Sequence, residues 1–317
     1  MNRVLITGGN GFLGSNLARF FLKKGYTVAV ISRSCSNIND LLESIQFIKH
    51  STPGYEDLSQ QIINFSPTLV IHSAWDGGNA YKDVNSLNQY QNILQGIELL
   101  EVLSTLSHKP IFVGIGSFSE YGKITTSALE TDLDNPNTRY GQSKSCFKNI
   151  SQKICDQFGI SWRWIRPCLI YGPGDVSTRL IPSIIQKQLL SEEITLDSCN
   201  SIVDYLHVED FCSGVFTSIQ SLSGVVNLCS GNEYSVRTIV KLLQKEISSE
   251  SVITFDSSKD RHLLSNRICG NSNKLRSTGW TATVTLVNGL RDLVLREKVK
   301  HLLKKNPVEL DGIHLEG

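Results

Sequence analysis

Three side chains, Ser117, Tyr140 and Lys144, have the types and the spacing that proton transfer to a carbonyl oxygen requires. Tyr140 and Lys144 are four residues apart, which places them on one face of a helix. Of the nine tyrosines, Tyr140 is the one followed by a lysine at that spacing. An isolated phenol has a pKa of about 10, and a nearby ammonium lowers it by stabilising phenolate. With a hydroxyl from Ser117 beside them, we predict a site that interconverts a carbonyl and an alcohol.

The first fourteen residues indicate the support that holds such a site. An apolar strand at residues 4–7 enters a glycine-spaced turn, and an apolar helix runs from about Gly11 to Lys24. Glycines let the backbone turn tightly and approach a pyrophosphate, and the helix N-terminus directs free N–H groups at the phosphates. We therefore predict a dinucleotide-binding turn. The residues that we expect to contact the dinucleotide here are Thr7, Gly8, Asn10, Gly11, Phe12, Leu13 and Gly14.

The end of the next predicted strand, residues 26–31, bears on which dinucleotide binds. A dinucleotide fold usually has an acid there for the adenosine ribose hydroxyls. This chain has Ser32, Arg33 and Ser34 instead. An acid would repel a 2′-phosphate, whereas a guanidinium flanked by hydroxyls would bind one. We therefore favour NADP(H) over NAD(H); the alternative is that Arg33 stacks on the adenine or faces solvent.

Strands and helices alternate through the first half of the chain. Further strands are predicted at residues 45–48, 69–72, 111–116 and 162–165, and helices at 92–104 and 143–158. This alternation predicts an α/β fold with a doubly wound parallel sheet of the Rossmann type, and Ser117 then lies at the ligand-binding end of a strand. From about Tyr171 the alternation loosens, which indicates a second, smaller α/β lobe. We predict a dinucleotide-binding domain at residues 1–170 and a substrate-binding lobe at 171–317, with residues 203–230 returning to the first domain.

Composition excludes several other classes of protein. Lys+Arg number 31 against 30 Asp+Glu, so the chain has no basic footprint for nucleic acid. No apolar run reaches membrane length, and a strand from Arg3 leaves no room for a signal peptide. The eight cysteines contain no CxxC pair, and several lie in apolar periodic segments. We expect reduced thiols, no metal site and a cytoplasmic enzyme.

Taken together, these motifs make the chain resemble the extended short-chain dehydrogenase/reductases, specifically those that act on nucleotide sugars. The matching segments occur in the family's order from residue 3 to about 291, so the resemblance covers nearly the whole chain. They are residues 7–14, 71–74, Ser117 with 120–122, Tyr140 with Lys144, 166–167 with 171–173, 204–210, and Lys274 before 279–280.

The resemblance implies roles for the residues at matching positions. Tyr140 would exchange a proton with the sugar oxygen, Ser117 would hydrogen-bond that oxygen, and Lys144 would hold the nicotinamide ribose and lower the pKa of Tyr140. Asn92, His72, Ser73 and Ala74 would lie along the cofactor, and Pro167 and Cys168 near the nicotinamide amide. Arg261 resembles the late arginine that grips the diphosphate of the sugar nucleotide.

Departures from the family narrow the chemistry. Sugar 4,6-dehydratases have an Asp-Glu pair after the catalytic hydroxyl, and here Phe118 and Ser119 stand in those places. Epimerase-reductases of the GDP-fucose type have a cysteine and a histidine where this chain has Ser119 and Gly174. With elimination and ring epimerisation disfavoured, we predict simple hydride transfer between a carbonyl and an alcohol.

Two more departures concern the substrate. Leu169 and Val203 replace an asparagine and an arginine that many members have, so we expect the diphosphate to be gripped differently. Trp75 would form one side of the sugar pocket; the alternative is that it only packs against a loop. Our candidates for substrate contact are Trp75, Phe118, Ser119, Arg179, Lys187 and Arg261.

The sequence thus leaves three kinds of function. We favour an NADPH-dependent reductase that acts on a nucleotide-linked 4-keto-6-deoxysugar. The first alternative is a nucleotide-sugar 4-epimerase that retains NAD, and the second is a non-catalytic dinucleotide sensor. The resemblance also suggests a homodimer formed through a helical face.

Overall fold

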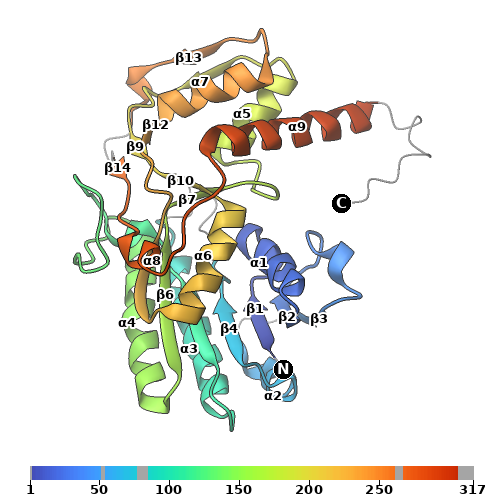
Figure 1. Ribbon diagram of the computed structural model, residues 1–317, viewed down its shortest axis with the longest axis vertical. Coiled ribbons are helices and arrows are strands. Elements are labelled where there is room, and N and C mark those ends of the chain that lie inside the picture. The colour runs from blue at the N-terminus through green and yellow to red at the C-terminus, as the bar shows by residue number, and fades with distance from the viewer. Residues whose placement is uncertain (1, 51–53, 77–84, 261–266, 306–317) are drawn as a thin grey trace.

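A parallel sheet forms the centre of the molecule (Figure 1). The computed structural model describes residues 2–50, 54–76, 85–260 and 267–305. Within these ranges the sheet has seven parallel strands in the order β11-β6-β5-β4-β1-β2-β3. Their bounds are β1 Arg3–Thr7, β2 Thr27–Ser32, β3 Gln46–Lys49, β4 Leu69–His72, β5 Ile111–Ile115, β6 Ser161–Pro167 and β11 Gly224–Leu228. The direction in which successive strands are added reverses between β1 and β4, and ligands of such sheets bind at the point of reversal.

Helices cover both faces of this sheet, as its buried strands require. Side chains alternate along β1: Val4 and Ile6 pack under α1 (Phe12–Lys23) and α6 (Val208–Ser221), whereas Leu5 packs on the opposite side. The opposite face is covered by α2 (Ser59–Phe65), α3 (Gln91–Ser104) and α4 (Arg139–Phe158). The predicted doubly wound α/β fold is therefore confirmed.

A smaller lobe stands over the carboxyl edge of the sheet (Figure 1). Its core lies between α5 (Leu180–Leu189), α7 (Val236–Ile247) and α9 (Leu286–Lys305). Short strands complete it, namely β7 Leu169–Tyr171 with β10 Tyr205–His207, β8 Ile194–Leu196 with β13 Ile253–Phe255, and β9 Ile202–Val203 between β12 Tyr234–Ser235 and β14 Arg267–Ile268. Between α6 and α8 (Asn273–Arg276) the chain returns to the large sheet through β11.

Short 3-10 helices follow several of the strands in the chain. They are η1 Asn39–Leu41, η2 Glu56–Leu58, η3 Leu87–Tyr90, η4 Phe118–Glu120 and η5 Ser257–Lys259. All eight cysteines are free thiols. None of the described helices is long and apolar enough to span a membrane.

The bounds of α4 decide where Tyr140 lies. We predicted a helix from residue 143, but α4 begins at Arg139 because the Thr138 hydroxyl caps it by accepting the N–H of Gly141 at 3.1 Å. Tyr140 therefore lies in the first turn of α4, and Lys144 follows one turn later on the same face.

Candidate active site

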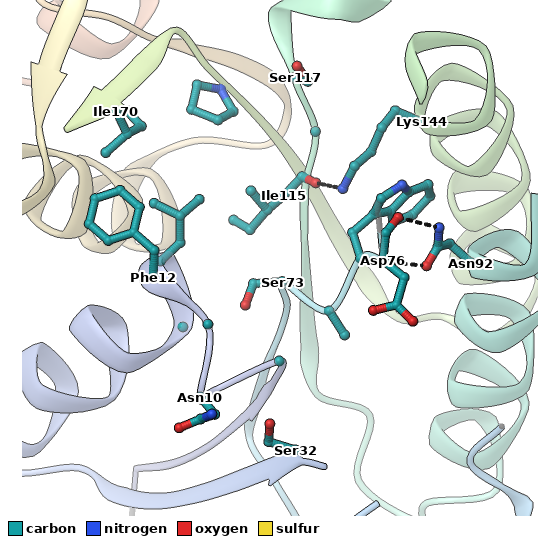
Figure 2. Close-up of a pocket in the computed structure, with 18 of the residues that line it drawn as sticks. Asn10, Phe12, Ser32, Ser73, Asp76, Asn92, Ile115, Ser117, Lys144 and Ile170 are labelled. Carbon is teal, nitrogen blue, oxygen red and sulfur yellow. Dashed lines mark hydrogen bonds between the residues drawn. The ribbon is translucent and has the colours of Figure 1, made fainter. Parts of the chain in front are cut away.

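One cleft runs along the carboxyl edge of the sheet, between the sheet and the smaller lobe, and encloses a volume of about 750 Å³. It extends from the glycine turn and the end of β2 to the ends of β5 and β6 and the start of α4. Figure 2 shows Asn10 and Ser32 at one end of this cleft and Ser117 and Lys144 at the other. Most of the predicted cofactor and catalytic residues thus share one cavity.

The glycine turn fits a dinucleotide pyrophosphate. Gly8 has φ +69, and a Cβ there would lie 2.7 Å from backbone atoms of Ala74. A Cβ on Gly14 would lie 2.3 Å from the carbonyl oxygen of Gly8, so the helix can pack close to the turn only without side chains. Gly11 caps α1 without a side-chain hydrogen bond from any described residue. The first N–H groups of α1 are therefore available to an anion in the cleft.

The three predicted catalytic residues lie together at the other end of the cleft. Ser117 follows β5, Tyr140 lies in the first turn of α4, and both line the cleft together with Lys144. The Nζ of Lys144 donates to the carbonyl oxygen of Ile115 at 2.6 Å, as Figure 2 also shows. Two hydroxyls that line one cavity can bind a carbonyl oxygen and give it a proton.

The acidity of Tyr140 differs from our prediction. Burial raises the pKa of Tyr140 to about 12, although the hydrogen bond from Ser117 and the charge of Arg179 lower it. The Nζ of Lys144 lies 5.9 Å from the centroid of the Tyr140 ring and is hydrogen-bonded to Ile115, so burial outweighs any decrease that its charge gives to this pKa. The phenol is therefore protonated at neutral pH and is ready to act as an acid.

Lys144 occupies an apolar setting that changes its own acidity. Its Nζ lies 3.7 Å from the centroid of the Trp75 ring, and the side chain is 3% exposed. Burial lowers the pKa of Lys144 to about 7, against the opposing charge of Glu120. Trp75 is itself fixed, because its Nε1 donates to Oε1 of Gln89 at 2.9 Å.

This low pKa predicts a pH dependence of dinucleotide binding. Below about pH 7 Lys144 is charged and can donate to a ribose hydroxyl; as the pH rises through 7 the empty enzyme loses that charge. Because the bound state favours the charged amine, the dissociation constant should be flat below pH 7 and weaken above it, by up to about tenfold per pH unit. Titration of NADPH at pH 6–9 measures this effect. A Lys144→Met variant should lack the inflection, and an identical pH profile in that variant would contradict the assignment.

Behind Ser117 lies a buried ionic network that the sequence analysis did not identify. The Glu120 carboxylate accepts the backbone N–H of Ser117 at 2.8 Å, Nε1 of Trp164 at 3.0 Å and Nε of Arg166 at 2.7 Å. Ser117 and Glu120 form a reciprocal capping box around η4. The Ser-x-x-Glu spacing was the signal that could have revealed it. Arg166 also pairs with Asp134, so the guanidinium and both carboxylates are held together behind Ser117.

The end of the cleft where we predict the adenosine is built from the residues that follow β2 and β4. Ser32, Arg33 and Ser34 line it as predicted, together with His50 and Tyr55, which we did not predict. Nδ2 of Asn10 donates to the hydroxyl of Ser34 at 2.8 Å and so ties the glycine turn to this exit. Arg33 forms an ion pair with Asp76 across the cleft.

The other residues that we predicted to contact the cofactor fall into two groups, those that line the cleft and those that are buried beneath it. Ser73, Ala74, Asn92, Pro167 and Cys168 line the cleft. Thr7 and His72, in contrast, lie beneath it and correct our expectation of direct contact.

The reason lies in the pairing of their side chains. His72 Nδ1 and Thr7 Oγ1 are hydrogen-bonded at 2.8 Å, and the imidazole packs between the rings of Phe112 and Phe147. Burial, with the charge of Lys144, lowers the pKa of His72 to about 3, so the ring is neutral.

Two substrate candidates also lie elsewhere. Phe118 is buried and packs on Gly270, where a Cβ would lie 2.2 Å from its ring. Lys187 is exposed on α5, about 12 Å along the helix from Arg179. Both therefore lie off the cleft wall. Trp75, Ser119 and Arg179 do line the cleft, and Arg261 lies outside the described residues.

Fold and cleft together define a Rossmann-type oxidoreductase with a serine, a tyrosine and a lysine at the end of its dinucleotide site. A family model described as the NAD dependent epimerase/dehydratase family matches residues 4–229. The chain belongs to this family, and so to the extended short-chain dehydrogenase/reductases.

Known relatives match more than nine-tenths of the chain at low identity. It is 26% identical over 310 residues to a GDP-6-deoxy-D-mannose reductase of Pseudomonas aeruginosa, covering 92% of this chain and 96% of that one. It is 22% identical over 307 residues to a putative UDP-glucose 4-epimerase of Methanocaldococcus jannaschii, covering 92% and 97%. The structure of a Thermotoga maritima UDP-glucose 4-epimerase with UDP-glucose has a TM-score of 0.86 at 21% identity, covering 94% and 99%.

Proposed function

We propose that this enzyme is an NADPH-dependent reductase that converts the 4-keto group of a nucleotide-linked 6-deoxysugar into an alcohol. The observation that carries the proposal is the protonated phenol of Tyr140, which lines the cleft together with Ser117 and Lys144. Among the described residues that line the cleft, Asp76 is the one carboxylate, and it lies at the adenosine end. Elimination or ring epimerisation needs a further acid/base pair beside the sugar, and this wall offers none from the described residues.

Different side chains of the protein would bind the carbonyl, deliver the proton and hold the ribose in such a reduction. The bound dinucleotide supplies the hydride. Ser117 donates to the carbonyl oxygen and orients it, and Tyr140 delivers the proton as negative charge develops there. Lys144, when charged, holds the ribose and stabilises the phenolate that remains. Its burial against Trp75 keeps water from this end of the cleft.

The substrate side of the cleft supports an anionic, partly apolar ligand. Arg179 lines the cleft near Tyr140 and also pairs with Asp175 at 3.2 Å. It is our candidate for the substrate diphosphate, together with Arg261. Leu169 and Ile170 line the same side and offer an apolar surface to a deoxysugar methyl. The named activity of the Pseudomonas relative, on a GDP-linked 6-deoxysugar, supports this substrate class.

The preference for NADPH rests on Arg33 at the end of β2, because a guanidinium there can bind a 2′-phosphate. We also propose a cytoplasmic homodimer. Large apolar side chains exposed around α3 and the start of α4 support a contact between copies on this face; they are Leu87, Leu94 and Leu133.

The experiment that separates a reductase from a 4-epimerase uses purified enzyme, a nucleotide-linked 4-keto-6-deoxysugar and NADPH. We expect one NADPH to be oxidised for each sugar reduced, measured as the loss of absorbance at the nicotinamide band against product by chromatography. Epimerisation of a nucleotide hexose without added cofactor would favour the epimerase instead.

A further inference from the structure

The carboxylate of Asp76 lies on the guanidinium of Arg33. Two hydrogen bonds join them, Nη2 to Oδ1 at 2.7 Å and Nη1 to Oδ2 at 3.1 Å. Asp76 follows β4 and Arg33 follows β2, and these strands flank β1 in the sheet. The ion pair therefore spans the carboxyl edge above the glycine turn, and both residues line the cleft.

The backbone of Asp76 is held by Asn92, whereas its side chain is exposed to solvent. Its N–H donates to Oδ1 of Asn92 at 2.8 Å, and Nδ2 of Asn92 donates to its carbonyl oxygen at 3.2 Å (Figure 2). Asn92 is buried, so this anchor is rigid. The side chains of Arg33 and Asp76 are 73% and 58% exposed, and an ion pair exposed to that extent is weak. A more strongly charged anion can therefore replace the carboxylate without moving the backbone.

We propose that Asp76 is a specificity-determining residue for the dinucleotide: its carboxylate occupies the N–H groups of Arg33 that a 2′-phosphate would take. This inference rests on the proposed function, which places the adenosine end of a dinucleotide at Arg33. The phosphate carries up to two charges and displaces the carboxylate, yet it binds beside a nearby negative charge. A dinucleotide without the phosphate does not compete for these N–H groups. Asp76 thus limits the preference for NADPH over NADH that Arg33 alone would give.

The test measures dissociation constants for NADPH and NADH by nicotinamide fluorescence, without sugar substrate. Asp76→Asn keeps the backbone contacts to Asn92 and removes the charge. We expect it to tighten NADPH about two- to fivefold and to change NADH by less than about 1.5-fold. In an Arg33→Ala background, which itself should weaken NADPH more than NADH, the substitution should lose its selective effect. The selective effect should also shrink as ionic strength rises.

A matched control is available on the neighbouring segment. Asp40 and Arg19 form an exposed pair with the same two-bond geometry, at 2.8 and 2.9 Å, and neither residue lines the cleft among those described. Asp40→Asn should leave the ratio of the two dissociation constants unchanged.

Three results would overturn the inference. An equal effect of Asp76→Asn on both dinucleotides, or weaker NADPH binding, would show that Asp76 does not compete with the phosphate. A selective effect that survives in Arg33→Ala would show that it does not act through Arg33. If Arg33→Ala itself leaves NADPH unchanged, the inference and the NADPH preference fail together. The reductase proposal is judged separately, by product formation from the keto-sugar.

Discussion

Replacing Tyr140 by phenylalanine should abolish turnover while the enzyme still folds and binds its dinucleotide. The substitution removes the proton that burial retains on the phenol. A positioned general acid contributes about 10²- to 10⁴-fold to rate, so we expect kcat to fall by that factor. The dissociation constant for NADPH should change by less than about threefold, because the glycine turn and Arg33, which we predict to bind the phosphates, lie at the other end of the cleft.

Tyr90 provides the control for this loss. It is an exposed phenol near α4 that donates to Gln142 at 3.3 Å, and it does not line the cleft among the described residues. Tyr90→Phe should therefore retain wild-type kcat. Activity of Tyr140→Phe within a few-fold of wild type would refute the assignment of the acid. Equal loss in both variants would point to damage of the fold instead.

Replacing Glu120 by glutamine should destabilise the fold more than a surface substitution does. The carboxylate is fully buried and serves three different donors, and Arg166 beneath it is 1% exposed. Glutamine would direct an amide N–H at one of these donors and remove a counter-charge of the guanidinium. Breaking a buried pair by removing one partner costs about 3–5 kcal/mol. We expect about 3 kcal/mol less free energy of unfolding in urea, because Asp134 still pairs with Arg166.

The same substitution should also alter catalysis in a way that a purely structural role would not. The charge of Glu120 raises the pKa of both Tyr140 and Lys144, so its loss should shift the pH profile of kcat towards lower pH. Glu56→Gln, at an exposed position, should alter neither stability nor profile. A stable Glu120→Gln variant with an unchanged profile would contradict the role that we assign to this network.

The sequence predicted the sheet and the cleft because both follow local rules. Apolar strands, a glycine turn and helical spacing determine the order of elements, and the carboxyl ends of parallel strands meet at one edge. Ser117, Tyr140 and Lys144 could therefore be grouped from spacing alone, and the structure brings them into one cavity. Their roles in catalysis stay a prediction.

The errors arose where the direction of a side chain decides the outcome. Phe118 follows the catalytic serine in sequence but turns into the core against Gly270, and His72 turns beneath the sheet edge towards Phe147. Neither direction is encoded in the spacing of residues. The pKa of Tyr140 was misjudged for a similar reason, because burial depends on all the elements packed around the phenol.

Contacts between distant segments could not be foreseen at all. Arg33 and Asp76 are 43 residues apart, and Arg166 and Glu120 are 46 apart. Each pair forms because the parallel sheet brings the ends of its strands to one edge: β2 and β4 flank β1, and β5 lies beside β6. Many polar residues follow strands. Such pairs need a three-dimensional structure to be identified, and here they surround the site.

The most direct test of the proposed function follows the hydride. The enzyme is supplied with NADPH deuterated on both hydrogens at C4 of the nicotinamide, together with a nucleotide-linked 4-keto-6-deoxysugar, and the product is examined by mass spectrometry and proton NMR. We predict one deuterium per product molecule, located at C4 of the sugar, with one equivalent of NADPH oxidised. Recovery of the unchanged keto-sugar with no NADPH oxidised, while a nucleotide hexose supplied in its place is converted into its C4 epimer without incorporating deuterium, would contradict this account.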